Sequence, residues 1–164
     1  MKTLIFLVFI SIFVSGINKV LPQTLTPLNS LKDIQSLKEQ EKGKVILINF
    51  WATWCKPCVS EFPDLVKLYN DYKGKGFELV FISLDMTEDV QTKVVPFLSQ
   101  HGVDFTTYYN NMEKPEELIN YIDKNWEGAI PATYIYDKDG NLTASTIGRK
   151  GYEYFEKEVI KDLD

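Results

Sequence analysis

The stretch that decides the fold is FWATWCKPC at residues 50–58, which begins inside the apolar run VILINFW of residues 45–51. A run that is β-branched and apolar almost throughout is typical of a strand covered on both faces. A proline fits the first turn of a helix, where its missing N–H costs no hydrogen bond, so Pro57 favours a helix that begins near Cys55. The pattern therefore predicts a buried strand that delivers two cysteines to a strand-to-helix junction.

Working outward from this junction, strands and helices alternate along the chain. Ser30 and Asp33 have the spacing of a capping box, which predicts a helix that ends at Gly43. The other expected elements are helices over 55–73, 88–100, 115–124 and 152–163, and strands over 77–84, 103–108, 132–136 and 141–147. This order predicts an α/β fold of three layers, with a central sheet flanked by helices.

Composition excludes several classes of protein. A chain of 164 residues with 45% hydrophobic and 25% charged residues has room for one globular domain. Its net charge of −5 leaves no basic surface for nucleic acid. The two cysteines and the single His101 do not make a four-ligand zinc site, so we expect no metal and no cofactor.

The N-terminus has the features of a secretory signal peptide over residues 1–16. Lys2 precedes an eleven-residue apolar run at 4–14, and small or permissive residues follow at 14–16. An uncleaved membrane anchor is the alternative, but only the fifteen residues 3–17 are compatible with lipid, fewer than the roughly 20 that a spanning helix needs. We expect a linker over 17–29 and a domain over 30–164, located in the periplasm or secreted, or anchored outside the cytoplasm, where disulfides are permitted.

The two cysteines are placed for redox chemistry. The N-terminus of a helix favours negative charge, and Lys56 adds a positive charge nearby, so Cys55 is the expected thiolate. Cys58, one turn later, would be better covered and able to resolve a mixed disulfide. An inert disulfide between the two residues is the alternative that the motif alone leaves open.

Three segments together resemble a known family. FWATWCKPC, Glu61-Phe62-Pro63 and GAIPATYIYDKDG are similar to the TlpA/ResA-like thiol–disulfide oxidoreductases of the thioredoxin superfamily. The resemblance implies a thioredoxin-like fold with a mixed sheet, with Cys55 as the attacking thiol and Cys58 as the resolving one. It also implies a cis peptide bond at Pro131, opposite the cysteine pair. The substrate-binding surface implied by the resemblance comprises Trp54, Pro57, Ile130 and Pro131.

One position departs from ordinary thioredoxins, in which an aspartate lies six residues before the first cysteine. Asn49 occupies this position and cannot titrate, whereas Glu61 lies three residues after Cys58, on the same helix face. TlpA/ResA-like proteins resemble this arrangement. We therefore expect Glu61 to have a raised pKa and to exchange a proton with Cys58. The alternative is a solvated acid that complements the helix dipole.

These features predict an enzyme that reduces protein disulfides through Cys55 and Cys58 by way of a mixed disulfide. A proline at position 57 resembles the reducing members of the superfamily. The resemblance implies disulfide-containing protein substrates, apocytochrome c among the candidates, and a membrane thiol shuttle as electron donor. One alternative is a thiol peroxidase, although Ala52 replaces the threonine of its TxxC motif and Arg149 is the only arginine. The other alternative is a binding module with a structural disulfide. The oligomeric state is left open.

Overall fold

The computed structural model describes residues 24–163. The expected signal peptide and residues 17–23 of the expected linker lie outside the described residues. Within the described part, no helix is long and apolar enough to cross a membrane.

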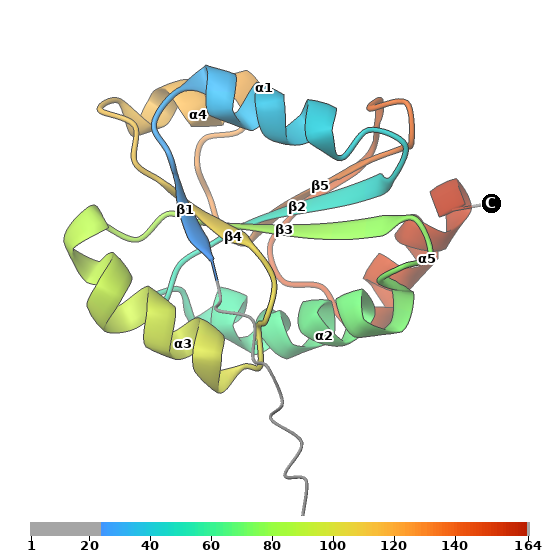
Figure 1. Ribbon diagram of the computed structural model, residues 1–164, viewed down its shortest axis with the longest axis horizontal. Coiled ribbons are helices and arrows are strands. Elements are labelled where there is room, and N and C mark those ends of the chain that lie inside the picture. Colours follow the sequence, from blue (N-terminus) through green and yellow to red (C-terminus); the bar gives the residue numbers. More distant parts are fainter. Residues whose placement is uncertain (1–23, 164) are drawn as a thin grey trace, which may run out of the picture.

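A single mixed sheet runs through the middle of the molecule (Figure 1), in the order β1-β4-β3-β2-β5-β6. The first four strands in this order are parallel, and β5 and β6 form an antiparallel hairpin beside β2. The strands are β1 (Leu25–Leu28), β2 (Val45–Trp51), β3 (Phe77–Ser83), β4 (Thr107–Asn110), β5 (Ala132–Tyr136) and β6 (Leu142–Ile147).

Helices cover both faces of this sheet, as Figure 1 shows. One face carries α1 (Leu31–Gln40) and α4 (Pro115–Ile122), and the other carries α2 (Lys56–Tyr72), α3 (Val95–Gln100) and α5 (Tyr152–Leu163). The predicted three-layer α/β fold is confirmed. The capping box also forms, since the Asp33 carboxylate accepts a hydrogen bond from the Ser30 N–H at 2.9 Å.

The central strand β2 is buried along its whole length, as its apolar sequence predicts. Because successive side chains of a strand point to opposite faces, Leu47 and Trp51 pack on the α2 side while Ile48 and Phe50 pack on the α1 side. The same alternation turns Asn49 toward α2. A polar side chain is thereby placed in the core, directly beneath the helix that carries the cysteines.

The expected linker is wrong at its C-terminal end, because residues 25–28 form the edge strand β1. This strand pairs in parallel with β4, so the domain begins before residue 30. Pro27 is tolerated there because an edge strand has one side without strand partners. Its partner β4 lies at 107–110 instead of the expected 103–108.

The expected helix over 88–100 is divided into three segments. A 3₁₀ turn at Thr87–Asp89 and a π-helical turn at Val90–Val94 precede α3. Pro96 has no N–H and cannot donate to the carbonyl of Thr92, so the α-helical ladder is interrupted at this point.

An aromatic cluster between α2 and the sheet provides a test of the packing. The Phe62 ring is 1% exposed and stacks on Phe81 with the ring centroids 4.1 Å apart. We predict that Phe62→Ala lowers the free energy of unfolding by about 3–5 kcal/mol, because it leaves a cavity among aromatic rings. Urea unfolding followed by circular dichroism measures this loss. The control is Ile160→Ala on the exposed side of α5, which should change stability by less than about 0.5 kcal/mol.

Candidate active site

Cys55 and Cys58 form a disulfide at the junction between β2 and α2. Cys55 is the N-cap of α2, and its Sγ accepts a hydrogen bond from the Cys58 N–H at 3.3 Å. Both side chains are buried, but Cys55 is 6% exposed and Cys58 only 2%. The helix terminus therefore offers a backbone donor to the more accessible sulfur, which is the arrangement that stabilises a thiolate after reduction.

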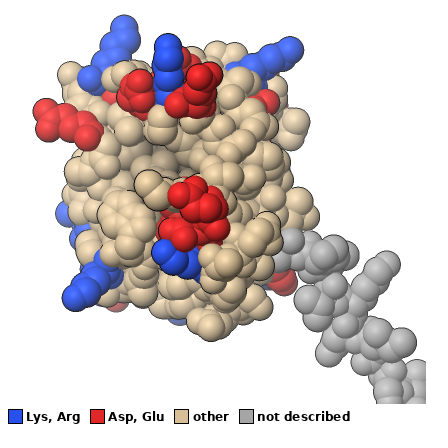
Figure 2. Space-filling view, turned by 90° about the vertical axis from the view of Figure 1, so that its left-hand side faces the viewer, with Lys and Arg blue, Asp and Glu red and all other residues tan. Residues whose placement is uncertain are grey.

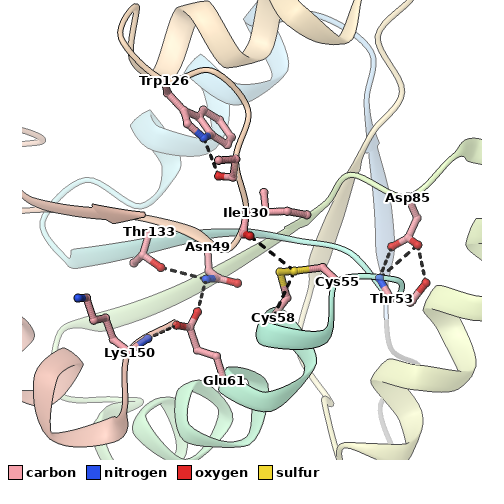
Figure 3. The surroundings of a disulfide bond; sticks show 11 residues. Asn49, Thr53, Cys55, Cys58, Glu61, Asp85, Trp126, Ile130, Thr133 and Lys150 are labelled. Atoms are coloured by element: carbon pink, nitrogen blue, oxygen red, sulfur yellow. Dashed lines mark hydrogen bonds between the residues drawn. A yellow bond between two sulfur atoms is a disulfide. The ribbon is translucent and has the colours of Figure 1, made fainter. Parts of the chain in front are cut away.

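A loop distant in sequence lies over this disulfide (Figure 3). The Ile130–Pro131 peptide bond is cis, and the Ile130 carbonyl oxygen lies 3.7 Å from Cys55 Sγ, across a separation of 75 residues. Trp126 anchors the loop, because its indole N–H donates to the Ala129 carbonyl at 2.8 Å and its ring packs on Phe50. The structure thus brings together Cys55, Ile130 and Pro131 as the resemblance implies.

Glu61 lies beneath the disulfide and is 1% exposed. Its carboxylate accepts hydrogen bonds from the Asn49 side-chain amide at 3.0 Å and from the Lys150 N–H at 2.7 Å. The same Asn49 amide donates to Thr133 Oγ1 at 2.9 Å (Figure 3). Residues of α2, β2, β5 and the loop after β6 therefore share one hydrogen-bond network around the buried carboxyl group.

Burial raises the pKa of Glu61 from 4.5 to about 7, because the charged form loses its hydration. The hydrogen bonds from Lys150 and Asn49 and the positive charge of Arg149 act in the opposite direction, and are weaker together than the effect of burial. The expected rise in pKa is confirmed, and the alternative of a solvated acid is wrong because the side chain is buried. The exchange of a proton with Cys58 stays a prediction.

A second buried carboxylate, which is not among the residues expected from the sequence, holds the loop before Cys55. Asp85 is 3% exposed and accepts hydrogen bonds from the Thr53 N–H at 2.9 Å and from the Thr53 hydroxyl (Figure 3). It also accepts a hydrogen bond from the Ser83 hydroxyl at 2.8 Å. A signal was present in the sequence, since Asp85 follows the strand β3 and the carboxyl ends of neighbouring parallel strands lie at the same edge. No comparable signal points to Lys150, which lies 89 residues from Glu61.

The remaining predicted residues lie around the disulfide on the surface. Trp54 is 65% exposed, and Pro57 is exposed in the first turn of α2. Figure 2 shows the end of the molecule at which β2 and β3 terminate, a face that is hollowed near its centre, with charged side chains along its upper edge and below the hollow. Among the described residues, no group of histidine, cysteine and acidic side chains could hold a metal ion.

The fold and the disulfide site define a domain of the thioredoxin superfamily. A family profile described as "AhpC/TSA family" matches residues 18–145. The chain belongs to the AhpC/TSA family.

Named relatives agree with this assignment. The "Thiol-disulfide oxidoreductase ResA" of Bacillus thuringiensis (strain Al Hakam) is 36% identical over 120 residues, which cover 73% of this chain and 64% of the relative. This chain therefore matches less than two thirds of that relative's length. The protein of that name from Bacillus subtilis (strain 168) is 27% identical over 107 residues, which cover 65% of this chain and 55% of the relative.

Solved structures show the same similarity. The thiol:disulfide interchange protein, a thioredoxin family protein from Chlorobium tepidum TLS, superposes with a TM-score of 0.66 at 27% identity, covering 77% of this chain and 85% of that one. A second structure from Chlorobium tepidum, of a putative thiol:disulfide interchange protein DsbE, has a TM-score of 0.63 at 26% identity and covers 77% of this chain and 84% of that one.

The raised pKa of Glu61 predicts a pH dependence of stability. The folded state retains this proton up to about pH 7, whereas the unfolded chain releases it near 4.5. The contribution of the Glu61 proton to the free energy of unfolding is therefore fully present below about pH 4.5, and it is lost as the pH rises through 7. Between pH 5 and 8 the oxidised wild type should lose on the order of 1–3 kcal/mol of unfolding free energy relative to Glu61→Gln.

Urea unfolding at a series of pH values measures this difference. Glu127→Gln removes an exposed acid and serves as the control, which should follow the wild type at every pH. A constant difference between wild type and Glu61→Gln across this range would contradict the raised pKa.

Proposed function

We propose that this chain is an extracytoplasmic thiol–disulfide oxidoreductase that reduces disulfides of other proteins. The observation that carries the proposal is the Cys55–Cys58 pair at the N-terminus of α2, with the Ile130 carbonyl and a cis-proline on one side and a buried Glu61 on the other. The similarity to proteins named as thiol-disulfide oxidoreductases supports the same chemistry. The leader-like residues 1–16 support a location outside the cytoplasm.

The reaction begins with the reduced pair. The Cys55 thiolate attacks one sulfur of the substrate disulfide, a mixed disulfide forms, and the other substrate sulfur leaves as a thiolate that takes up a proton. The helix terminus and the Cys58 N–H lower the free energy of the attacking anion. Trp54, Pro57, Ile130 and Pro131 surround the sulfur and would contact the substrate segment.

Resolution of the mixed disulfide requires Cys58 as a thiolate. Glu61 lies one helical turn beyond Cys58, and with a pKa of about 7 it can accept the thiol proton near neutral pH. Cys58 then attacks Cys55 Sγ, the Cys55–Cys58 disulfide forms, and the second substrate sulfur leaves. Two electrons have moved from the cysteine pair to the substrate, and a membrane thiol shuttle would return two electrons to the pair.

Trapping of the mixed disulfide tests this sequence of steps. Cys58→Ser removes the resolving thiol, so it should accumulate covalent adducts with disulfide-containing proteins that a reducing agent releases. Cys55→Ser should form no such adducts, because the remaining Cys58 is covered. Non-reducing electrophoresis and mass spectrometry identify the adducts, and equal trapping by the two variants would contradict the assigned order of attack.

The reduction potential separates the alternative functions. A potential well below about −300 mV, together with no reduction of insulin, would indicate a structural disulfide in a binding module. Rapid oxidation of Cys55 by hydrogen peroxide with a sulfenic acid intermediate would indicate a thiol peroxidase. Reduction of insulin by the dithiol form, with slow reaction toward peroxide, is the result that the proposal predicts.

A further inference from the structure

Two large apolar side chains are unusually exposed for their type. Met86 is 67% exposed and Trp54 is 65% exposed, more than any other large hydrophobic side chain in the described part of the protein. Exposed apolar groups that lie together mark interaction sites more often than isolated ones do. The question is whether these two belong to one surface.

Hydrogen bonds join the two loops that carry them. Trp54 follows Thr53, Met86 follows Asp85, and the Asp85 carboxylate accepts the Thr53 N–H at 2.9 Å together with the Thr53 hydroxyl. Because Asp85 is buried and also bonded to the Ser83 hydroxyl at 2.8 Å, this connection is held firmly. The backbone of Met86 is therefore placed at a set position relative to Trp54 and Cys55.

Met86 also forms one wall of a cavity of about 280 Å³ at the ends of β3 and β4. Apolar side chains make up most of its lining: Leu84, Met86, Met112, Pro115 and Ile119. Pockets for drug-sized ligands usually span about 300–1,000 Å³, so this cavity is better matched to one or two side chains. Methionine walls adapt to side chains of different shape, which suits a polypeptide ligand.

The charged residues at the cavity and next to its lining are mostly acidic. Glu88 lines it, and the exposed Glu113 and Glu116 flank Met112 and Pro115 in the sequence. The lining of the cavity contains no lysine or arginine, and the neighbouring Lys93 pairs with Asp89 at 2.8 Å. In Figure 2 a group of acidic side chains lies below the hollow on this face, with a basic side chain next to it. An apolar cavity with a negative rim is complementary to an apolar side chain that has a basic neighbour.

We propose that Met86 and this cavity bind an extended segment of the substrate protein, with one bulky apolar side chain in the cavity and a lysine or arginine beside Glu88. The inference rests on the proposed function for its substrate, a protein disulfide that must reach Cys55. Because Cys55 is only 6% exposed, the segment around a substrate disulfide has to lie across this face. Trp54 and Met86 would then contact the same segment on its way to the cavity.

Methyl NMR of the whole protein tests binding without any redox step. The chain has three methionines, and two of them, Met86 and Met112, line the cavity, so ¹³C-methyl-methionine labelling reports on it directly. The probes are synthetic peptides in which serine replaces the reactive cysteine and one residue is lysine. In each probe a leucine occupies a different position beside the serine. The reference peptide has alanine in place of the leucine. We expect the best leucine peptide to bind about tenfold more tightly than the alanine peptide and to shift both methyl signals.

Two variants assign the effect to the cavity. Met86→Ala should remove most of the preference for leucine, a loss of roughly five- to tenfold in affinity that the remaining Met112 signal reports. Leu142→Ala, which removes an exposed apolar side chain at the start of β6, should bind as the wild type does. Equal affinity for leucine and alanine peptides, or an unchanged preference in Met86→Ala, would overturn the proposal.

Charge and chemistry are tested separately. Replacing the peptide lysine by glutamate should weaken binding about threefold to tenfold at low salt, and Glu88→Gln should reduce this difference. Equal binding of the two peptides to the wild type would refute the basic neighbour.

The same peptides with cysteine, coupled as mixed disulfides to thionitrobenzoate, report attack by the reduced protein through release of the coloured thiol. Selective methyl shifts without any release would refute the proposed function and leave the binding surface standing. Release at equal rates from leucine and alanine peptides, without selective shifts, would refute the binding surface and leave the proposed function standing.

Discussion

A carboxyl group buried in the core needs hydrogen-bond donors. At Glu61 this need determines which segments lie beneath the disulfide. Its donors come from the Asn49 side chain on β2 and from the Lys150 N–H in the loop after β6. Asn49 in turn is held by Thr133, its register partner on β5. Loss of the Asn49 or Lys150 contact would leave one buried oxygen of Glu61 without a donor, which costs more than the net gain of one hydrogen bond.

This network connects the helix that carries the cysteines with the strand that follows the cis-proline. Thr133 lies two residues after Pro131, so the position of the Ile130 carbonyl over Cys55 and the position of Glu61 under Cys58 are coupled through Asn49. On the other side of the disulfide, Asp85 fixes the loop that precedes Cys55. The sulfur pair thus lies between two hydrogen-bonded networks, each built on a buried acid. Preorganised surroundings of this kind are what thiol exchange needs, because the reacting sulfurs must align.

The face outside the disulfide differs in character from these networks. It is apolar at Trp54 and Met86 and negatively charged around the cavity beside Met86. Several proteins similar to this chain are named for thiol–disulfide exchange, and the cavity lies outside the segment that carries the cysteines. In the mechanism we propose, the networks would set how fast a disulfide is exchanged, and the surface would set which protein presents it.

Much of the fold could be predicted because it depends on local patterns. The apolar run of β2, the proline after Cys55 and the alternation of elements determined the three layers and the strand-to-helix junction. The edge strand β1 was missed because two prolines and no periodicity look like a linker, and only pairing with β4 makes residues 25–28 a strand. The division of the expected helix over 88–100 likewise depends on which backbone hydrogen bonds form around Pro96.

The same distinction holds for the site. The sequence by itself determined that Cys55 and Cys58 lie at a helix N-terminus and that Glu61 shares a helix face with Cys58, because spacing along one helix is a local property. Only the tertiary structure decided that Glu61 is buried, that Lys150 donates to it, and that Asp85 holds Thr53. These contacts join residues far apart in the chain. They depend on the order of the strands and on which loops meet at one end of the sheet, and no local pattern records that order.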